Sequence, residues 1–270
     1  MPLGYRVLGW VLFGFWAAMS TQLVLRDLVP DDAPLPTAGY KDQLAHVELA
    51  RPRVERIGMY LAGKRLGTSV VTRTRLETGG FRIEGTTDLA LDALVHARLP
   101  ALSQLPGGNL LDGLVPKLDT VAWVDDEYHL ERFDIAVTVA GTTHHVLGEQ
   151  LGSGLVVTTD LGGKAESRTL PFDGQAVLGM LLVPAESPAR LKVGNAWAVR
   201  NLDPMTGTTQ TARRHVARRE RIAVAGRIHD CYVIHTEVDG KATTTTWVDL
   251  EGALVREERP FGLRLEREDP

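Results

Sequence analysis

The sequence predicts a mainly β protein, in which an N-terminal transmembrane helix precedes a curved antiparallel sheet or half-barrel with one or two short helical inserts. Three observations carry this prediction. The chain opens on a long apolar stretch, Val7–Leu25. The 270 residues include 27 Gly and 14 Pro, which is more helix-breaking residues than a helical bundle usually contains. From Val54 onward, short β-rich runs alternate with turn signals at a spacing of about 8–12 residues, which is typical of an all-β barrel or sandwich.

Residues 1–26 form the predicted signal-anchor. At a rise of about 1.5 Å per residue, Val7–Leu25 spans about 28 Å, enough to cross a hydrocarbon core. Arg6 precedes the stretch, whereas Asp27, Asp31 and Asp32 follow it, so the charge bias places the N-terminus in the cytoplasm and the body in the periplasm. The alternative is a cleaved signal peptide with a small-residue site at Ala18–Ser20, which would leave a soluble periplasmic protein.

A linker, residues 27–53, follows the anchor. Its Asp31–Pro36 segment contains two prolines and favours an extended conformation. One short helix is predicted around Asp42–Leu49, before Pro52 ends it.

The β domain covers residues 54–270 and divides into three groups of hairpins. Turn signals separate its strands. The clearest turn signals are Ala62-Gly63-Lys64, Glu77-Thr78-Gly79-Gly80, Asp125-Asp126-Glu127, Ala140-Gly141, Gly162-Gly163, Asp239-Gly240 and Asp249–Gly252.

Two inserts interrupt the strands. Leu99–Leu118 is predicted as a Leu-rich loop, and Gly174–Pro184 is apolar enough for a short buried helix. One interpretation makes the inserts the lid of an apolar cavity, and the other makes them plugs for the open side of the sheet. The candidate lid residues are Leu178, Met180, Leu181 and Leu182.

A short internal echo links two of the hairpins. Trp123-Val124-Asp125-Asp126-Glu127 recurs as Trp247-Val248-Asp249-Leu250-Glu251, and a leucine follows at the same offset, Leu130 or Leu254. We expect equivalent hairpins on one sheet, with both tryptophans facing inward and the acidic residues keeping each turn in water.

Four motifs resemble a known family. They are Tyr60–Gly67 (YLAGKRLG), Asp203–Thr206 (DPMT), Thr246–Glu258 (TWVDLEGALVREE) and Pro260–Leu263 (PFGL). Together they resemble an uncharacterised bacterial exported domain associated with transglutaminase-like proteins, over roughly Val54–Arg267. That domain is in turn distantly similar to lipoprotein-carrier (LolA-like) half-barrels. The resemblance implies a curved sheet that cups an apolar ligand, but no transglutaminase catalytic set is present.

Composition and spacing argue against several classes of site. A net charge of −4 argues against a dedicated nucleic-acid binder, which is usually basic. A single cysteine rules out an intramolecular disulfide. His229 and His235 share a strand face with Cys231 but lie about 20 Å apart, too far for one metal ion. Asp125–Glu127 is too short for a calcium loop. We therefore expect no catalytic set, no metal site and no cofactor.

The densest charge lies in residues 213–221, where five arginines and one glutamate occur among nine residues. The arginines are Arg213, Arg214, Arg218, Arg219 and Arg221. Because neither face of such a strand is apolar, we expect an edge or protruding strand. It would either bind anionic lipid head groups or an acidic partner, or protect an exposed edge from aggregation.

These features predict a single-pass inner-membrane protein with a non-catalytic periplasmic domain. The first hypothesis is that the cupped sheet holds a lipid or another apolar ligand. The alternative is an interaction subunit of an envelope complex, docking a protein partner through sheet edges or the Arg213–Arg221 strand. An open concave volume would favour the first, and a filled core with an exposed patch the second.

Overall fold

The structure is a computed structural model that describes residues 35–44, 52–90, 116–160, 163–172, 174–178, 191–204 and 206–268. Contacts divide the chain into Met1–Leu35 and Pro36–Pro270, and every helix and strand described here lies in the second unit. The strands are β1 (Thr37–Ala38), β2 (Arg53–Leu61), β3 (Lys64–Arg75), β4 (Phe81–Leu89), β5 (Lys117–Val124), β6 (Leu130–Val139), β7 (Thr142–Leu151), β8 (Gly154–Asp160), β9 (Ala165–Pro171), β10 (Val177–Leu178), β11 (Ala196–Leu202), β12 (Thr209–Val224), β13 (Arg227–Val238), β14 (Lys241–Val248), β15 (Leu254–Glu258) and β16 (Leu263–Arg267). The helices are α2 (Tyr40–Leu44) and a 3₁₀ turn, η3 (Pro260–Gly262).

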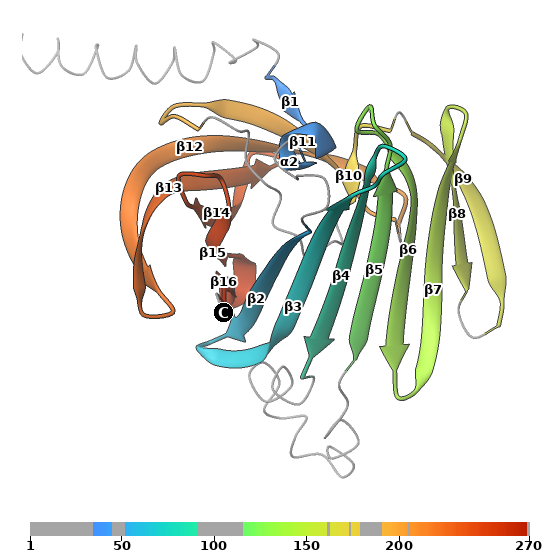
Figure 1. Ribbon diagram of the computed structural model, residues 1–270, viewed down its shortest axis with the longest axis horizontal. Coiled ribbons are helices and arrows are strands. Elements are labelled where there is room, and N and C mark those ends of the chain that lie inside the picture. The colour runs from blue at the N-terminus through green and yellow to red at the C-terminus, as the bar shows by residue number, and fades with distance from the viewer. Residues whose placement is uncertain are drawn as a thin grey trace, which may run out of the picture. The chain divides into compact units, whose positions relative to one another are not determined.

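All sixteen of these strands belong to one sheet, in the order β1-β11-β12-β13-β14-β15-β16-β2-β3-β4-β5-β6-β7-β8-β9, with β10 paired to β11. From β11 to β16 and again from β2 to β9 the neighbours are antiparallel and follow chain order, and β2 to β9 run side by side as one broad sheet (Figure 1). The two series join where β16 pairs antiparallel with β2. The prediction of a mainly β fold with a curved antiparallel sheet is confirmed.

Two-residue turns connect the strands of several hairpins. Both residues have positive φ in Ala62–Gly63, Ala140–Gly141, Ala225–Gly226 and Asp239–Gly240. Such turns match the right-handed twist of the strands they join, and glycine adopts positive φ without a steric penalty. Three of the four were predicted as turns from sequence.

The main core lies on one face of this sheet, which we call the inner face. On β4, Phe81 and Ile83 are buried and alternate with polar residues that point to the other side, the outer face. Tyr40 and Leu44 of α2 and Leu178 of β10 belong to the same buried cluster. The backbone N–H of Leu178 donates a hydrogen bond of 3.1 Å to the Tyr40 hydroxyl, and burial raises the pKa of that hydroxyl above its ordinary value.

A second buried cluster occupies the opposite face of β12–β15. It consists of Ile222, Val224, Cys231, Val233, Trp247 and Val255. The pairing of β12 with β13 shifts register between Val216 and Arg218, and a bulge of this kind bends a strand. Beyond it, β12 and β13 arch around β14 and β15 (Figure 1), which buries this second cluster.

The two ends of the sheet approach each other through side chains. Arg168 on β9 donates hydrogen bonds to the carbonyl oxygens of Pro204, at 2.9 Å, and Thr206, at 3.2 Å, in the turn between β11 and β12. Leu170 also lies against Gly207, where a Cβ would come within 2.6 Å of its side chain. In the described residues, contacts of this kind connect β9 to the other end of the sheet, and the two ends are not paired strands.

Several sequence predictions need correction or lie outside the described residues. The predicted helix at Gly174–Pro184 is wrong where it can be compared, because Val177–Leu178 forms strand β10 on β11. The predicted helix at Asp42–Leu49 begins earlier, at Tyr40, and residues 45–50 are outside the described part. Most of the Leu99–Leu118 loop is also outside, although β5 already begins at Lys117.

The anchor prediction falls on residues that are not described. Among the residues that are, no helix has both the length and the apolar character needed to cross a membrane. The span Val7–Leu25 is not part of that set.

Candidate functional site

The predicted arginine strand is β12, and the structure divides it in two. Its first half, with Arg213 and Arg214, lies inside the sheet between β11 and β13, so the edge-strand prediction is wrong there. Its second half, from Arg218 to Val224, pairs with β13 alone in the described part of the chain. The sequence pattern did not reveal this division because the bulge after Val216 changes the alternation of faces.

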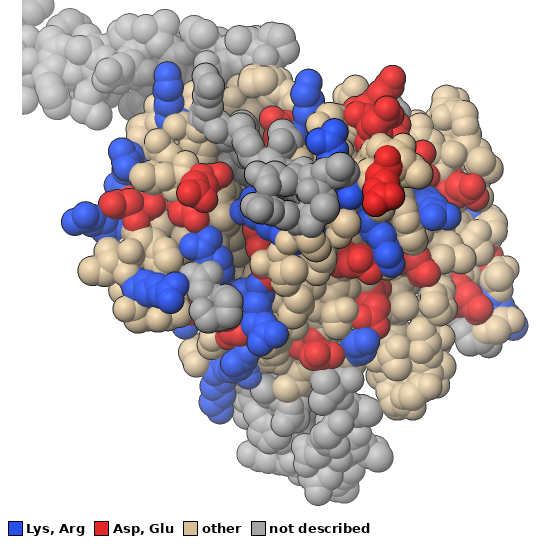
Figure 2. Space-filling model, in the orientation of Figure 1, with Lys and Arg blue, Asp and Glu red and all other residues tan. Residues whose placement is uncertain are grey.

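The five arginines lie in different environments, with Arg213, Arg218, Arg219 and Arg221 exposed and Arg214 partly buried. Burial lowers the pKa of the Arg214 guanidinium, and the nearby Glu257 carboxylate acts in the opposite direction. Three others are engaged locally: Arg218 pairs with Glu220 at 2.7 Å, Arg221 pairs with Asp230 at 2.9 Å, and Arg219 lies 5.4 Å from the Tyr232 ring centroid. Figure 2 shows acidic and basic side chains interspersed over the visible face.

The structure describes one of the four candidate lid residues. Leu178 is buried in the main core, on β10. Met180, Leu181 and Leu182 lie outside the described residues.

Cys231 is fully buried in the second cluster, and burial raises the pKa of its thiol to about 11. A protonated, inaccessible thiol is a poor nucleophile. The His235 ring is tilted against the His215 ring, with centroids 5.4 Å apart, and burial lowers the pKa of His235. Within the described ranges, no group of three His, Cys, Asp or Glu side chains is placed to hold a metal ion.

The Trp-Val echo marks two equivalent hairpins, as predicted. In β5–β6 the register is Trp123 to Arg132 and Val124 to Leu130, and in β14–β15 it is Trp247 to Arg256 and Val248 to Leu254, with the same one-residue shift. The turns match as well. The Asp125 N–H donates to the His129 carbonyl at 2.9 Å, and the Asp249 N–H donates to the Ala253 carbonyl at 2.8 Å.

The prediction that both tryptophans face the core is wrong for Trp123. Val124 and Val248 point into the main core, so each neighbouring tryptophan lies on the opposite face of its strand. Trp247 is only 8% exposed because the bent ends of β12 and β13 cover it. Among the described residues no segment covers Trp123 in this way, and its side chain is half-buried on the outer face.

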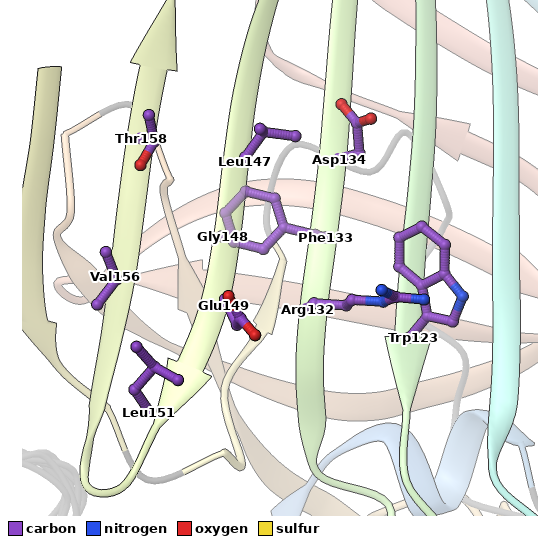
Figure 3. Close-up of a pocket in the computed structure, with 10 residues that line it drawn as sticks. All are labelled: Trp123, Arg132, Phe133, Asp134, Leu147, Gly148, Glu149, Leu151, Val156 and Thr158. Carbon is purple, nitrogen blue, oxygen red and sulfur yellow. The ribbon is translucent and has the colours of Figure 1, made fainter. Parts of the chain in front are cut away.

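A groove of about 370 Å³ opens on the outer face of β5–β8, beside Trp123 (Figure 3). Its lining residues are Trp123, Arg132, Phe133, Asp134, Leu147, Gly148, Glu149, Leu151, Val156 and Thr158. Gly148 has no side chain, which leaves room on the inner face for the Phe133 ring, since a Cβ there would lie 2.1 Å from the ring edge. Leu147 and Leu151 are 44% and 58% exposed at the rim.

Cationic groups surround the Trp123 ring. The Arg132 guanidinium carbon lies 4.1 Å from the ring centroid and that of Arg82 lies 5.9 Å away. Asp134 meets the His145 ring nitrogen at 3.2 Å. The groove therefore combines an aromatic ring, exposed leucines and charges of both signs, a composition that suits binding of a protein segment.

Sequence reasoning missed this site, although one signal was available. Trp123 shares strand parity with Lys117 and Asp119, which form an exposed ion pair of 2.9 Å, so all three belong on the outer face. The echo with Trp247 concealed that signal, because it suggested one environment for both rings.

The described part of the chain is thus a mainly β domain with one curved sheet and an exposed groove on its outer face. No protein-family model matches the sequence, and a search of curated proteins gives no match. Among solved structures, it is similar to a beta-barrel-like protein of the domain of unknown function DUF1849 from Brucella abortus. The TM-score is 0.47 and the identity 10%, over 82% of this chain and 96% of that one. The expected relation to transglutaminase-associated domains and lipoprotein carriers stays a prediction.

Proposed function

We propose that the protein is a membrane-anchored periplasmic interaction module, which docks a partner protein on the outer face of its sheet without catalysing a reaction. One observation carries this proposal. Trp123 stands half-buried beside a groove whose rim leucines, Leu147 and Leu151, are exposed to solvent. Tryptophan and arginine are enriched at protein interfaces, and exposed apolar side chains beside them are typical of an interaction surface.

The inner face gives less support to the alternative, a lipid carrier. Tyr40, Leu44 and Leu178 pack there against buried residues of the sheet and belong to the same core. An apolar ligand at this place would have to displace them and break the hydrogen bond between Tyr40 and Leu178. The arginines of β12 are also a weaker candidate site, because Arg218 and Arg221 already pair with carboxylates.

The anchor and the compartment are part of the proposal and rest on sequence alone. The apolar stretch Val7–Leu25 is long enough to span a bilayer, and the acidic residues after it favour export of the body. Full-length protein should sediment with the inner membrane. Mature protein that begins at Thr21 would instead indicate cleavage and a soluble periplasmic form.

Site-specific photo-crosslinking in cells tests the docking proposal. A benzophenone amino acid at Leu151 should give one discrete protein adduct, whereas the same probe at Thr143, exposed on the other end of β7, should give none. Native mass spectrometry of the full-length protein provides the counter-test. A stoichiometric copurified lipid, together with no adduct at Leu151, would overturn the interaction proposal in favour of a carrier.

A further inference from the structure

The two equivalent hairpins carry the same row of side chains across three strands. In β5–β6–β7, Trp123 faces Arg132, which faces Glu149, and in β14–β15–β16 the corresponding residues face one another in the same order. The three equivalent pairs are Trp123 and Trp247, Arg132 and Arg256, and Glu149 and Glu266. In the described part of the chain the same row of side chains therefore occurs twice, once covered and once uncovered.

The cover in the second half is the chain itself. On the strand next to Trp247, Val233 is its paired neighbour, and β12 and β13 continue beyond that point to the turn at Ala225–Gly226. The extra residues fold back over the tryptophan. Ile222 and Val224 are buried with it, and Cys231 packs in the same cluster.

Polar contacts fix this cover at its edges. The Trp247 indole N–H donates to the Glu220 carboxylate at 3.5 Å. Arg256 holds Glu266 at 2.8 Å and also donates to the backbone carbonyl of Ala223 at 3.2 Å. The covering strand thus reads acidic-x-apolar-x-apolar, from Glu220 through Ile222 to Val224.

The corresponding hairpin in the first half ends too soon to do this. Arg82 is the paired neighbour of Trp123, and one residue earlier Phe81 pairs with Arg75, next to the turn. No described segment folds over Trp123. Its ring is instead flanked by guanidinium groups, with Arg132 at 4.1 Å from the centroid.

We propose that the Trp123 surface binds a β-hairpin of a partner protein, whose covering strand has the pattern acidic-x-apolar-x-apolar. The acidic side chain would accept from the Trp123 indole N–H, the apolar pair would pack on the ring and on Leu151, and a backbone carbonyl would accept from Arg132. The inference rests on the proposed function. The chemistry expected of the partner is that of the β12 segment that covers Trp247 in this chain.

The chain provides its own probe. A head-to-tail cyclised peptide of residues 219–232, with the substitution Cys231→Ser, carries the covering hairpin in a closed form. Labelled with a fluorophore, it should bind the full-length protein, as measured by anisotropy. We expect Trp123→Ala to weaken binding at least tenfold and Arg132→Ala about threefold. The matched control Thr143→Ala, on the same face but away from the groove, should leave affinity unchanged. In the peptide, Glu220→Gln should weaken binding and a scrambled sequence should abolish it.

The possible outcomes separate this inference from the proposed function. If the peptide fails to bind, or binds the Trp123→Ala protein as well as the parent, the inference is wrong. If a crosslinked partner at Leu151 persists unchanged in the Trp123→Ala protein, the interaction function stands but this partner chemistry does not. A homodimer that Trp123→Ala dissociates would replace the partner with a second copy and overturn the proposal as stated. Because Trp123 is partly buried, the melting temperature of each variant provides a check that loss of binding is not loss of fold.

Discussion

The two equivalent tryptophans should differ sharply in what they contribute to stability. Trp247 is 8% exposed and packed in the second cluster, so truncation to alanine removes a buried ring and leaves a cavity. Truncation of a large buried aromatic costs about 3–5 kcal/mol. Trp123 lies on the outer face, where the main loss is its contacts with Arg132 and Arg82 at 4.1 and 5.9 Å. Cation–π contacts at exposed sites contribute about 0.5–1 kcal/mol each, so we expect Trp123→Ala to cost about 1–2 kcal/mol.

Urea unfolding of the full-length protein, followed by circular dichroism, measures both values. A domain has a total stability of about 5–15 kcal/mol, so even the Trp247→Ala protein should retain a measurable transition. Phenylalanine at each position is the matched control, because it restores most of the apolar area. Equal costs for the two alanine variants would refute the assignment of the rings to a covered and an uncovered surface.

Three further predictions concern the interior. Because burial raises the pKa of the Cys231 thiol to about 11, the folded protein should resist a disulfide reagent near pH 8. The thiol ionises at lower pH when unfolded, so its contribution to stability should be lost as the pH rises from about 9 through about 11. Gly148→Ala places a Cβ 2.1 Å from the Phe133 ring and should destabilise the protein by about 1–3 kcal/mol in the urea assay, whereas an unchanged midpoint would show that the ring can move aside. Tyr40→Phe leaves the buried N–H of Leu178 without its acceptor and should cost about 1–3 kcal/mol, and hydrogen exchange at Leu178 should quicken.

Local features were predictable from the sequence. The turns Ala140–Gly141 and Asp239–Gly240 join strands as expected, because a two-residue turn with positive φ depends only on the residues in it. The repeated Trp-Val hairpin was also found from sequence, since its bulge and turn are local.

Features that depend on distant strands were not predictable in the same way. The burial of Trp247 in a second core depends on a bulge after Val216, in another strand, which bends β12 over the ring. The internal position of Arg213 depends on β11 pairing with β12. Trp123 lacks a cover among the described residues because the neighbouring β3–β4 hairpin is short, and the length of that hairpin is not predictable from Trp123 itself.

The pairing of β16 with β2 has a consequence for biogenesis. Ile57 aligns with Arg267, so β2 completes its hydrogen bonds only with a strand that is made long after it. Contacts between residues so far apart in sequence slow folding, because a long loop must close before the pairing stabilises it. Until then β2 presents an open edge that can pair with other chains. The risk of pairing with other chains therefore lasts longer for β2 than for β3 to β8, whose partner strands are their neighbours in sequence.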